Sequence, residues 1–265
     1  MIIFITMHFC SFLLCSTLLL CSSLSTILCT SSFQEVYSVS NDTALAHINP
    51  KQPSFHHNFC ESKLQNNKGP EIMNSYTSLI ISIVPIVLGF PKYPLFYNVA
   101  CMLAANGVAS YHYHYYLDWV GKQADEISMI LANYFGLWGL INVYYKRSEA
   151  RNKLNRYNTA FMYSFLVFNT LMHYDQLFPS IFGVYVGGSL YMIYQVAQKY
   201  KVAYKRYLLV SLTGAISWII CEHFCNEITK YGHPLWHILF PLGFYQLLLE
   251  YDKLKTKIDD LNGGT

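Results

Sequence analysis

Three histidines, a serine and an aspartate stand at spacings that suit hydrolytic chemistry. Ser110 and His114 lie four residues apart in one apolar stretch, and Asp125 follows at the start of the next. His233 and His237 are also four residues apart, in the last apolar stretch. Side chains at positions i and i+4 share one face of a helix, so each pair can point to one spot. Three neutral imidazoles, with a fourth position left for water, form a typical catalytic zinc site.

The composition favours a membrane protein built from bilayer-spanning helices. Hydrophobic residues make up 53% of the 265-residue chain and charged residues only 12%, which is too little charge to cover a soluble surface. The net charge of +3 is too small to indicate nucleic-acid binding. Seven mostly apolar segments are long enough to cross a bilayer, and we therefore predict an all-α, polytopic bundle of seven transmembrane helices. The expected spans are 73–90, 95–117, 125–144, 157–175, 180–198, 206–225 and 232–250.

The amino-terminal region is expected to be separate from this bundle. An apolar run at 2–20, followed by small residues, resembles a secretory signal peptide, so we assign residues 1–30 to a cleaved signal. The run lacks a basic start, which leaves an uncleaved signal anchor as the alternative. Residues 31–72 then form a polar lumenal segment, in which Asn41 begins an acceptor tripeptide for N-linked glycosylation. Residues 73–251 form the membrane domain, and residues 252–265 form a polar tail.

The distribution of basic residues predicts the orientation of the bundle. Thirteen Lys and Arg residues lie in the tail and in the loops that follow spans one, three and five. The other short loops hold only Lys122 and Lys230. Because the more basic side of a membrane protein faces the cytosol, the amino terminus is predicted to be lumenal and the carboxyl terminus cytosolic.

This orientation brings the five residues to a common depth. Span two runs outward, so Ser110 and His114 fall near its lumenal end. Spans three and seven run inward, so Asp125, His233 and His237 fall near their lumenal beginnings. The site is therefore predicted at the lumenal side of the bundle, where ionisable residues within membrane helices indicate function.

The same residues also have a simpler interpretation. A single histidine within a membrane helix is more often a hydrogen-bond partner of a neighbouring helix than a metal ligand. Taken alone, His233 and His237 are as compatible with a structural role as with metal binding. Ser110 can bond to its own helix. The metal site is favoured because His114 and Asp125 are predicted at the same membrane depth as His233 and His237.

Three motifs together resemble the alkaline ceramidase family. They are S-x-x-x-H at 110–114, D-E-x-x-M at 125–129 and H-x-x-W-H at 233–237. The ceramidases belong to a wider group of seven-helix intramembrane hydrolases, which includes adiponectin-receptor-like proteins and Per1-type enzymes that remodel anchored-protein lipids. The D-E-x-x-M run and the Trp before the last His are more specific to ceramidases. The resemblance covers about residues 58–250, and an amino-terminal signal peptide is not typical of the family.

The resemblance implies zinc-dependent hydrolysis of the amide bond of ceramide, which yields a sphingoid base and a fatty acid in sphingolipid metabolism. Zinc is expected on His114, His233 and His237, where it would acidify a water and polarise the amide carbonyl. Asp125 is the expected general base and acid. Ser110 is the expected donor to the developing oxyanion or to the water. The substrate is a membrane lipid, and the expected location is the endoplasmic reticulum or Golgi.

The resemblance also implies a calcium site in the segment before span one. Glu61, Glu71 and Asn74 match the family's acidic and amide positions, which suit the oxygen preference of calcium. Asn58 replaces a usual aspartate and Lys63 replaces an expected amide, and the spacing is one residue short. These changes remove negative charge. Capping of a helix by Glu71 and solvation of Glu61 at the surface are the alternative roles.

A disulfide is implied by the same family pattern. The run W-x-x-x-E-x-x-C at 218–225 matches it, and Cys60 and Cys225 both fall on the lumenal side in the predicted topology, where disulfides persist. We therefore expect a bridge between Cys60 and Cys225.

Two other functions stay open. A Per1-like esterase that acts on anchored-protein lipids is compatible with the expected signal peptide, although the D-E-x-x-M run opposes it. A ligand-sensing seven-helix receptor with a structural zinc is the second alternative.

Overall fold

The computed structural model describes residues 59–66, 69–145, 148–172 and 177–263, and the following statements concern these residues. The expected signal peptide and the glycosylation acceptor Asn41 lie outside them. All regular structure in the described part is helical, which confirms the predicted all-α class. The elements are α2 (Cys60–Leu64), α3 (Ile72–Leu88), α4 (Pro94–Tyr116), α5 (Trp119–Tyr144), α6 (Glu149–Met172), α7 (Leu177–Tyr200), α8 (Lys205–His223), the 3-10 turn η2 (Thr229–Tyr231) and α9 (Gly232–Gly263).

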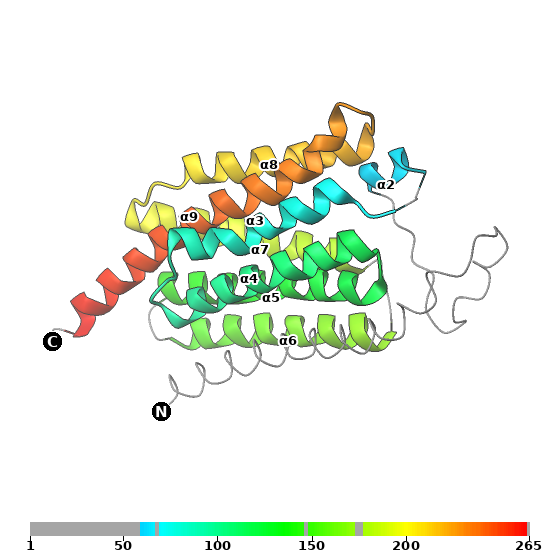
Figure 1. Cartoon of the computed structure of the whole chain (residues 1–265). Coiled ribbons are helices and arrows are strands. Elements are labelled where there is room, and N and C mark those ends of the chain that lie inside the picture. Colours follow the sequence, from blue (N-terminus) through cyan, green and yellow to red (C-terminus); the bar gives the residue numbers. More distant parts are fainter. Residues whose placement is uncertain (1–58, 67–68, 146–147, 173–176, 264–265) are drawn as a thin grey trace. The chain divides into compact units, whose positions relative to one another are not determined.

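The helices α3 to α9 run side by side (Figure 1) and correspond in order to the seven expected spans. Helix α3 packs on α4 and α9, α4 packs on α5, and α8 packs on α9. Helix α5 also packs on α6 and α7, around a core of Ile130, Tyr134, Met162, Phe165 and Tyr185. The short helix α2 lies at the end of the bundle where α8 and α9 meet (Figure 1).

Local sequence signals explain where α4 and α5 meet. Pro94 opens α4 at a position where its missing N–H costs nothing. Leu117 ends α4 in the left-handed conformation, with φ of 54°. Asp118 then caps α5, because its carboxylate accepts a hydrogen bond from the Gly121 backbone N–H at 2.6 Å. Asp125 consequently lies almost two turns inside α5. The expected span 125–144 placed it at the first residue of the helix instead.

The last helix extends beyond its expected end at residue 250. Helix α9 continues to Gly263, so most of the predicted tail is helical. The Asp252 carboxylate accepts hydrogen bonds from the backbone N–H groups of Lys92 and Tyr93, at 3.0 and 2.7 Å. These bonds satisfy donors at the start of α4, so the first residues of the tail belong to the folded bundle.

Two helices, α5 and α7, are each long and apolar enough to cross a bilayer, and α3 is apolar but shorter. Large apolar side chains also point outward from helices that do not meet this criterion. On α8 these are Leu209, Leu212, Ile216, Ile219 and Ile220, and on α3 they are Ile83, Ile86 and Val87. Large exposed apolar side chains gathered on helices in this way are typical of contact with lipid or another protein.

Candidate metal centre

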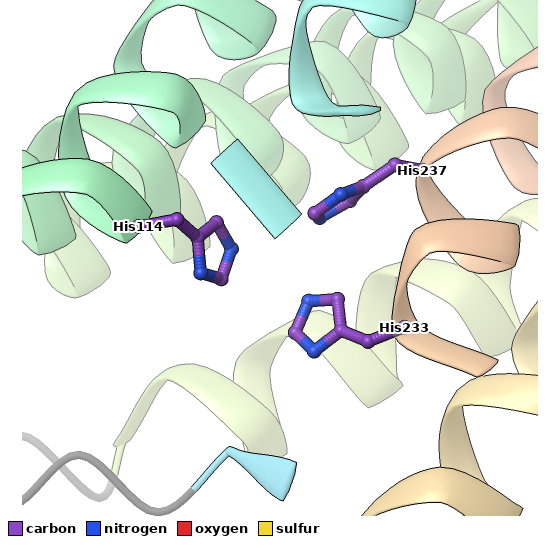
Figure 2. A group of neighbouring side chains, drawn as sticks. All are labelled: His114, His233 and His237. Carbon is purple, nitrogen blue, oxygen red and sulfur yellow. The ribbon is translucent and has the colours of Figure 1, made fainter. Parts of the chain in front are cut away.

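The three predicted metal ligands lie together, although they come from helices far apart in sequence. His114 is in the last turn of α4, and His233 and His237 occupy the first two turns of α9. Figure 2 shows the three rings turned toward a common space. One ring nitrogen from each residue lies within 4.8 Å of the others, and all three side chains are buried. The arrangement offers three nitrogen ligands to one ion.

Two of the rings are held through Nδ1 by carboxylates, one from the buried Glu71 and one from the partly buried Glu222. His114 Nδ1 lies 2.5 Å from Glu71 Oε2, and His233 Nδ1 lies 3.2 Å from Glu222 Oε1. An ionised carboxylate only accepts hydrogen bonds, so Nδ1 must carry the proton in both rings. The lone pair then resides on Nε2, which is the tautomer that a metal ligand requires.

The third ring is held by hydroxyl groups of α3. His237 Nδ1 lies 3.1 Å from Thr77 Oγ1 and 3.3 Å from Ser78 Oγ. These two hydroxyls donate to the backbone carbonyls of Met73 and Asn74, both at 2.7 Å. They therefore accept from His237 Nδ1–H, which again leaves Nε2 free. In all three histidines Nδ1 is engaged and Nε2 is the nitrogen left for a metal, and this donor set fits zinc.

Asp125 and Ser110 line the same site. Asp125 Oδ1 accepts a hydrogen bond from Asn106 Nδ2 at 2.7 Å, and its carboxyl interacts with Ser110 and His233. Ser110 Oγ lies 3.0 Å from Ser78 Oγ. The site therefore combines three nitrogen ligands, one carboxyl group and a hydroxyl, all buried.

Glu71 has a role that the sequence did not reveal. Its carboxylate is fully buried and contacts Ser62, Asn74 and His114. Burial alone would raise the pKa of this carboxyl, but the hydrogen bonds and the favourable electrostatic interaction with His114 outweigh burial and lower its pKa to about 2. Glu71 is therefore ionised at neutral pH and fixes the His114 ring.

The residues expected to bind calcium lie close together but are engaged by protein donors. Glu61 accepts hydrogen bonds from the backbone N–H groups of Met73 and Asn74, at 2.9 and 3.0 Å, and so caps the start of α3. Both oxygens of Glu71 are likewise used, by Ser62 on one side and by Asn74 and His114 on the other. These contacts satisfy the two carboxylates, whereas Asn74 Oδ1 is buried without a hydrogen-bond partner among the described residues, and calcium at Glu61, Glu71 and Asn74 stays a prediction.

The expected cysteine pair is brought together. The Sγ atoms of Cys60 and Cys225 lie 2.15 Å apart, at disulfide distance, and the Cα atoms lie 5.3 Å apart. The bridge joins α2 to the segment between α8 and α9. This position places α2 directly beside the metal centre, where the Phe59 ring contacts His114 and His233 with centroid distances of 5.3 and 4.7 Å.

Several supporting residues were missed by reasoning from sequence. Asn106 carries a signal that was available, because it lies one turn before Ser110 and two turns before His114 on the same face of α4. Glu222 is the glutamate of the W-x-x-x-E-x-x-C run at 218–225, which was interpreted only as a disulfide pattern, and Thr77 and Ser78 carry no such signal. They reach the histidines only through the packing of α3 and α8 against α9.

Comparison with known proteins agrees with this geometry. A family model described as Ceramidase matches residues 51–262, which include the entire candidate site. The chain is also 22% identical, over 218 residues, to alkaline ceramidase 1 of Mus musculus. That alignment covers 72% of this chain and 78% of the mouse protein.

Proposed function

Because the chain belongs to the ceramidase family, we propose that it hydrolyses the amide bond of ceramide to a sphingoid base and a fatty acid. The observation that carries this proposal is the buried set of three histidines, each held through Nδ1, beside Asp125 and Ser110. The family membership confirms the resemblance found in the sequence motifs. The amide specificity and the metal are the proposed parts.

His114, His233 and His237 are the proposed zinc ligands. Zinc bound there would supply Lewis-acid polarisation of the amide carbonyl and acidify the attacking water. The protein itself supplies the rest. The Nδ1 partners orient each imidazole and leave Nε2 as the metal-binding nitrogen, and burial of the site keeps bulk water away from the reacting groups.

Asp125 is the proposed proton carrier. Its carboxylate takes a proton from the attacking water and delivers it to the amide nitrogen, so that the amine can leave. Asn106 fixes the carboxylate through its 2.7 Å hydrogen bond. Ser110 is within reach to donate its hydroxyl hydrogen to the oxygen that becomes negative during the attack.

We further propose that the seven helices α3 to α9 span a membrane of the endoplasmic reticulum or Golgi. The outward apolar side chains and the asymmetry of basic residues support this assignment. The amino terminus would be lumenal and the carboxyl terminus cytosolic. The candidate site would then lie at the lumenal end of the bundle, on the same side as the Cys60–Cys225 pair.

Turnover assays with two substrates test the reaction. Purified protein is incubated with labelled ceramide and, separately, with a labelled phospholipid ester. We expect release of fatty acid from ceramide that is lost in His233→Ala and in Asp125→Asn. Cleavage of the ester alone would move the assignment to a Per1-like esterase, and bound metal without any turnover would favour a receptor.

Metal content tests the centre independently of activity. Mass spectrometry of the purified protein should find about one zinc per chain. A variant in which His233 and His237 are both replaced by alanine should contain none. Zinc retained by this double variant would contradict the proposed ligands.

A further inference from the structure

Glu222, in the last turns of α8, joins a proposed metal ligand to the disulfide segment. Its Oε1 atom accepts a hydrogen bond from His233 Nδ1, at 3.2 Å. Its Oε2 atom accepts one from the backbone N–H of Cys60, at 3.0 Å. The side chain is only 15% exposed. One carboxylate therefore uses one oxygen for the ligand and the other for a cysteine of the bridge.

A second contact strengthens the link between Glu222 and α2. The Lys63 ammonium lies 3.8 Å from Glu222 Oε2 and 3.4 Å from the Glu222 backbone oxygen. Both Lys63 and Cys60 belong to α2, which the bridge to Cys225 attaches to the segment that follows α8. The groups that orient the Glu222 carboxylate on this side thus all come from the segment that the disulfide holds.

We propose that Glu222 is a positioning residue that transmits the state of the Cys60–Cys225 bridge to the zinc ligand His233. The proposal rests on zinc binding at the three histidines, as proposed above. With the bridge closed, Cys60 N–H and Lys63 hold the carboxylate so that its other oxygen faces His233. When a dithiol reductant opens the bridge, Cys60 and Cys225 become thiols and the reductant becomes a disulfide. The bridge then no longer attaches α2 to the segment that follows α8, and the carboxylate loses the donors that direct it.

The physical reason lies in the orientation of the imidazole. A metal-bound histidine relies on the partner of its other nitrogen to fix the ring and the tautomer, and loss of such a partner costs about 10–100-fold in metal affinity. The groups that hold the other two rings cannot replace Glu222, because Glu71 is bonded to His114 and Thr77 is bonded to His237. The disulfide therefore regulates metal affinity through one carboxylate.

Zinc affinity of the full chain, measured by competition with a chromogenic chelator, tests the role of Glu222. We expect Glu222→Ala to weaken zinc binding by about 10–100-fold. Glu227→Ala is the matched control, because Glu227 lies in the adjoining segment, is 72% exposed and pairs only with Lys230 among the described residues. The control should bind zinc as the parent does. Equal affinities of the Glu222→Ala and Glu227→Ala variants would overturn the proposal.

A double-mutant cycle tests the transmission itself. Replacement of both Cys60 and Cys225 by serine should weaken zinc binding in the parent and in Glu227→Ala by about tenfold or more, but by less than about twofold in Glu222→Ala. An equal effect of the cysteine replacement in all three backgrounds would show that the bridge acts by another route. The visible spectrum of the Co²⁺-substituted protein should change in Glu222→Ala and remain unchanged in Glu227→Ala.

Glu222→Gln keeps the test decisive if the alanine variant does not fold. The glutamine amide has one accepting oxygen and one donating nitrogen, so it can serve His233 or Cys60 N–H but not both. We expect zinc affinity between those of the parent and Glu222→Ala, and a reduced response to the cysteine replacement. Parent-like values for both quantities would refute the transmission. Failure of the parent itself to bind zinc would instead refute the proposed metal centre.

Discussion

At the scale of single residues, the site is a set of polar side chains that all have defined partners. Asn106, Ser110 and His114 recur at intervals of four on α4, so they form one polar line along the buried face of this helix. The line ends at His114, whose ring is fixed by Glu71. Asn106, at its other end, holds Asp125 of the neighbouring helix. One helix face thereby positions both the proposed proton carrier, Asp125, and a proposed metal ligand, His114.

Asp125→Asn tests the proton carrier. The amide keeps the size of the side chain and can still accept the hydrogen bond from Asn106, but it cannot take a proton. We expect kcat for ceramide to fall by at least about 100-fold, with zinc content unchanged. Asp118→Asn is the control, since it lies at the same end of the bundle and asparagine also caps helices well. A loss of less than about tenfold in Asp125→Asn would exclude its role as general base.

At the scale of elements, the site depends on where helices start and on how closely they approach. Helix α5 begins at Trp119 because Asp118 caps it, and this start places Asp125 at the level of Ser110. Helix α3 approaches α4 at Gly107, where a Cβ atom would lie 2.6 Å from the Ser82 backbone nitrogen and 2.8 Å from the Ser78 carbonyl oxygen. Ser78 can reach both Ser110 and His237 only because of this approach.

Asp118→Ala tests the capping contact and its pH dependence. Burial opposes ionisation of this carboxyl, but hydrogen bonds from His112 and from the Gly121 and Val120 backbone outweigh burial and lower its pKa below 3.8. The stabilisation is therefore present above pH 3.8 and is lost as the pH falls through the lowered pKa. We expect Asp118→Ala to lose about 1 kcal/mol at neutral pH, measured by thermal unfolding in detergent. The difference from the parent should shrink below pH 3.8, and a constant difference would contradict the assigned ionisation.

Gly107→Ala tests the close approach of α3 and α4. The added methyl meets backbone atoms of α3, which cannot move aside as a side-chain end can, so the helices must separate. We expect a loss of about 1–3 kcal/mol in unfolding free energy, together with reduced turnover. Gly183→Ala is the matched control, because no atom lies within 4 Å of the added methyl there. Similar stability of the two variants would show that the α3–α4 contact is wider than described.

At the scale of the whole molecule, the proposed zinc joins the two ends of the helical region. His114 belongs to the second long helix and His233 and His237 to the last, so a bound ion would cross-link α4 with α9. The Cys60–Cys225 bridge adds a second link at the same end, between α2 and the segment after α8. Metal and disulfide would together hold segments that the chain connects only through more than a hundred residues.

Zinc removal should therefore destabilise the protein. A ligand that binds only the folded state adds RT ln(1 + [L]/Kd), or about 2.7 kcal/mol when its concentration is 100 times Kd. We expect the thermal midpoint to fall on treatment with a chelator and to recover when zinc is added back. His237→Ala should respond to neither treatment. An unchanged midpoint in the chelated parent would argue against a metal that bridges α4 and α9.

The orientation in the membrane makes a separate prediction. A tag at the carboxyl terminus should be digested when protease is added to sealed microsomes, because α9 would end in the cytosol. Treatment with a glycosidase should reduce the mass of the parent but not of Asn41→Gln, if Asn41 is lumenal and modified. A protected carboxyl-terminal tag would reverse the predicted topology.

Local spacing was sufficient to predict the order of the helices and to select three histidines that lie together in the structure. Apolar segment lengths predicted the order of α3 to α9, and intervals of four residues placed Ser110 with His114 and His233 with His237, because a helix repeats its faces over short distances. The motifs also predicted the ceramidase family, which the family match confirms. Helix ends were less predictable, since α5 starts earlier than its apolar run and α9 continues well past its own.

Tertiary packing decided which groups hold the histidines. Glu71 meets His114 across 43 residues, and Thr77 meets His237 across 160. Glu222 is only 11 residues from His233, but the two are separated by the turn between α8 and α9. Sequence spacing reports neighbours on one helix, whereas these partners depend on the rotation and distance of one helix against another. That relation is set by close contacts such as the one at Gly107, and it becomes visible only when the helices are packed.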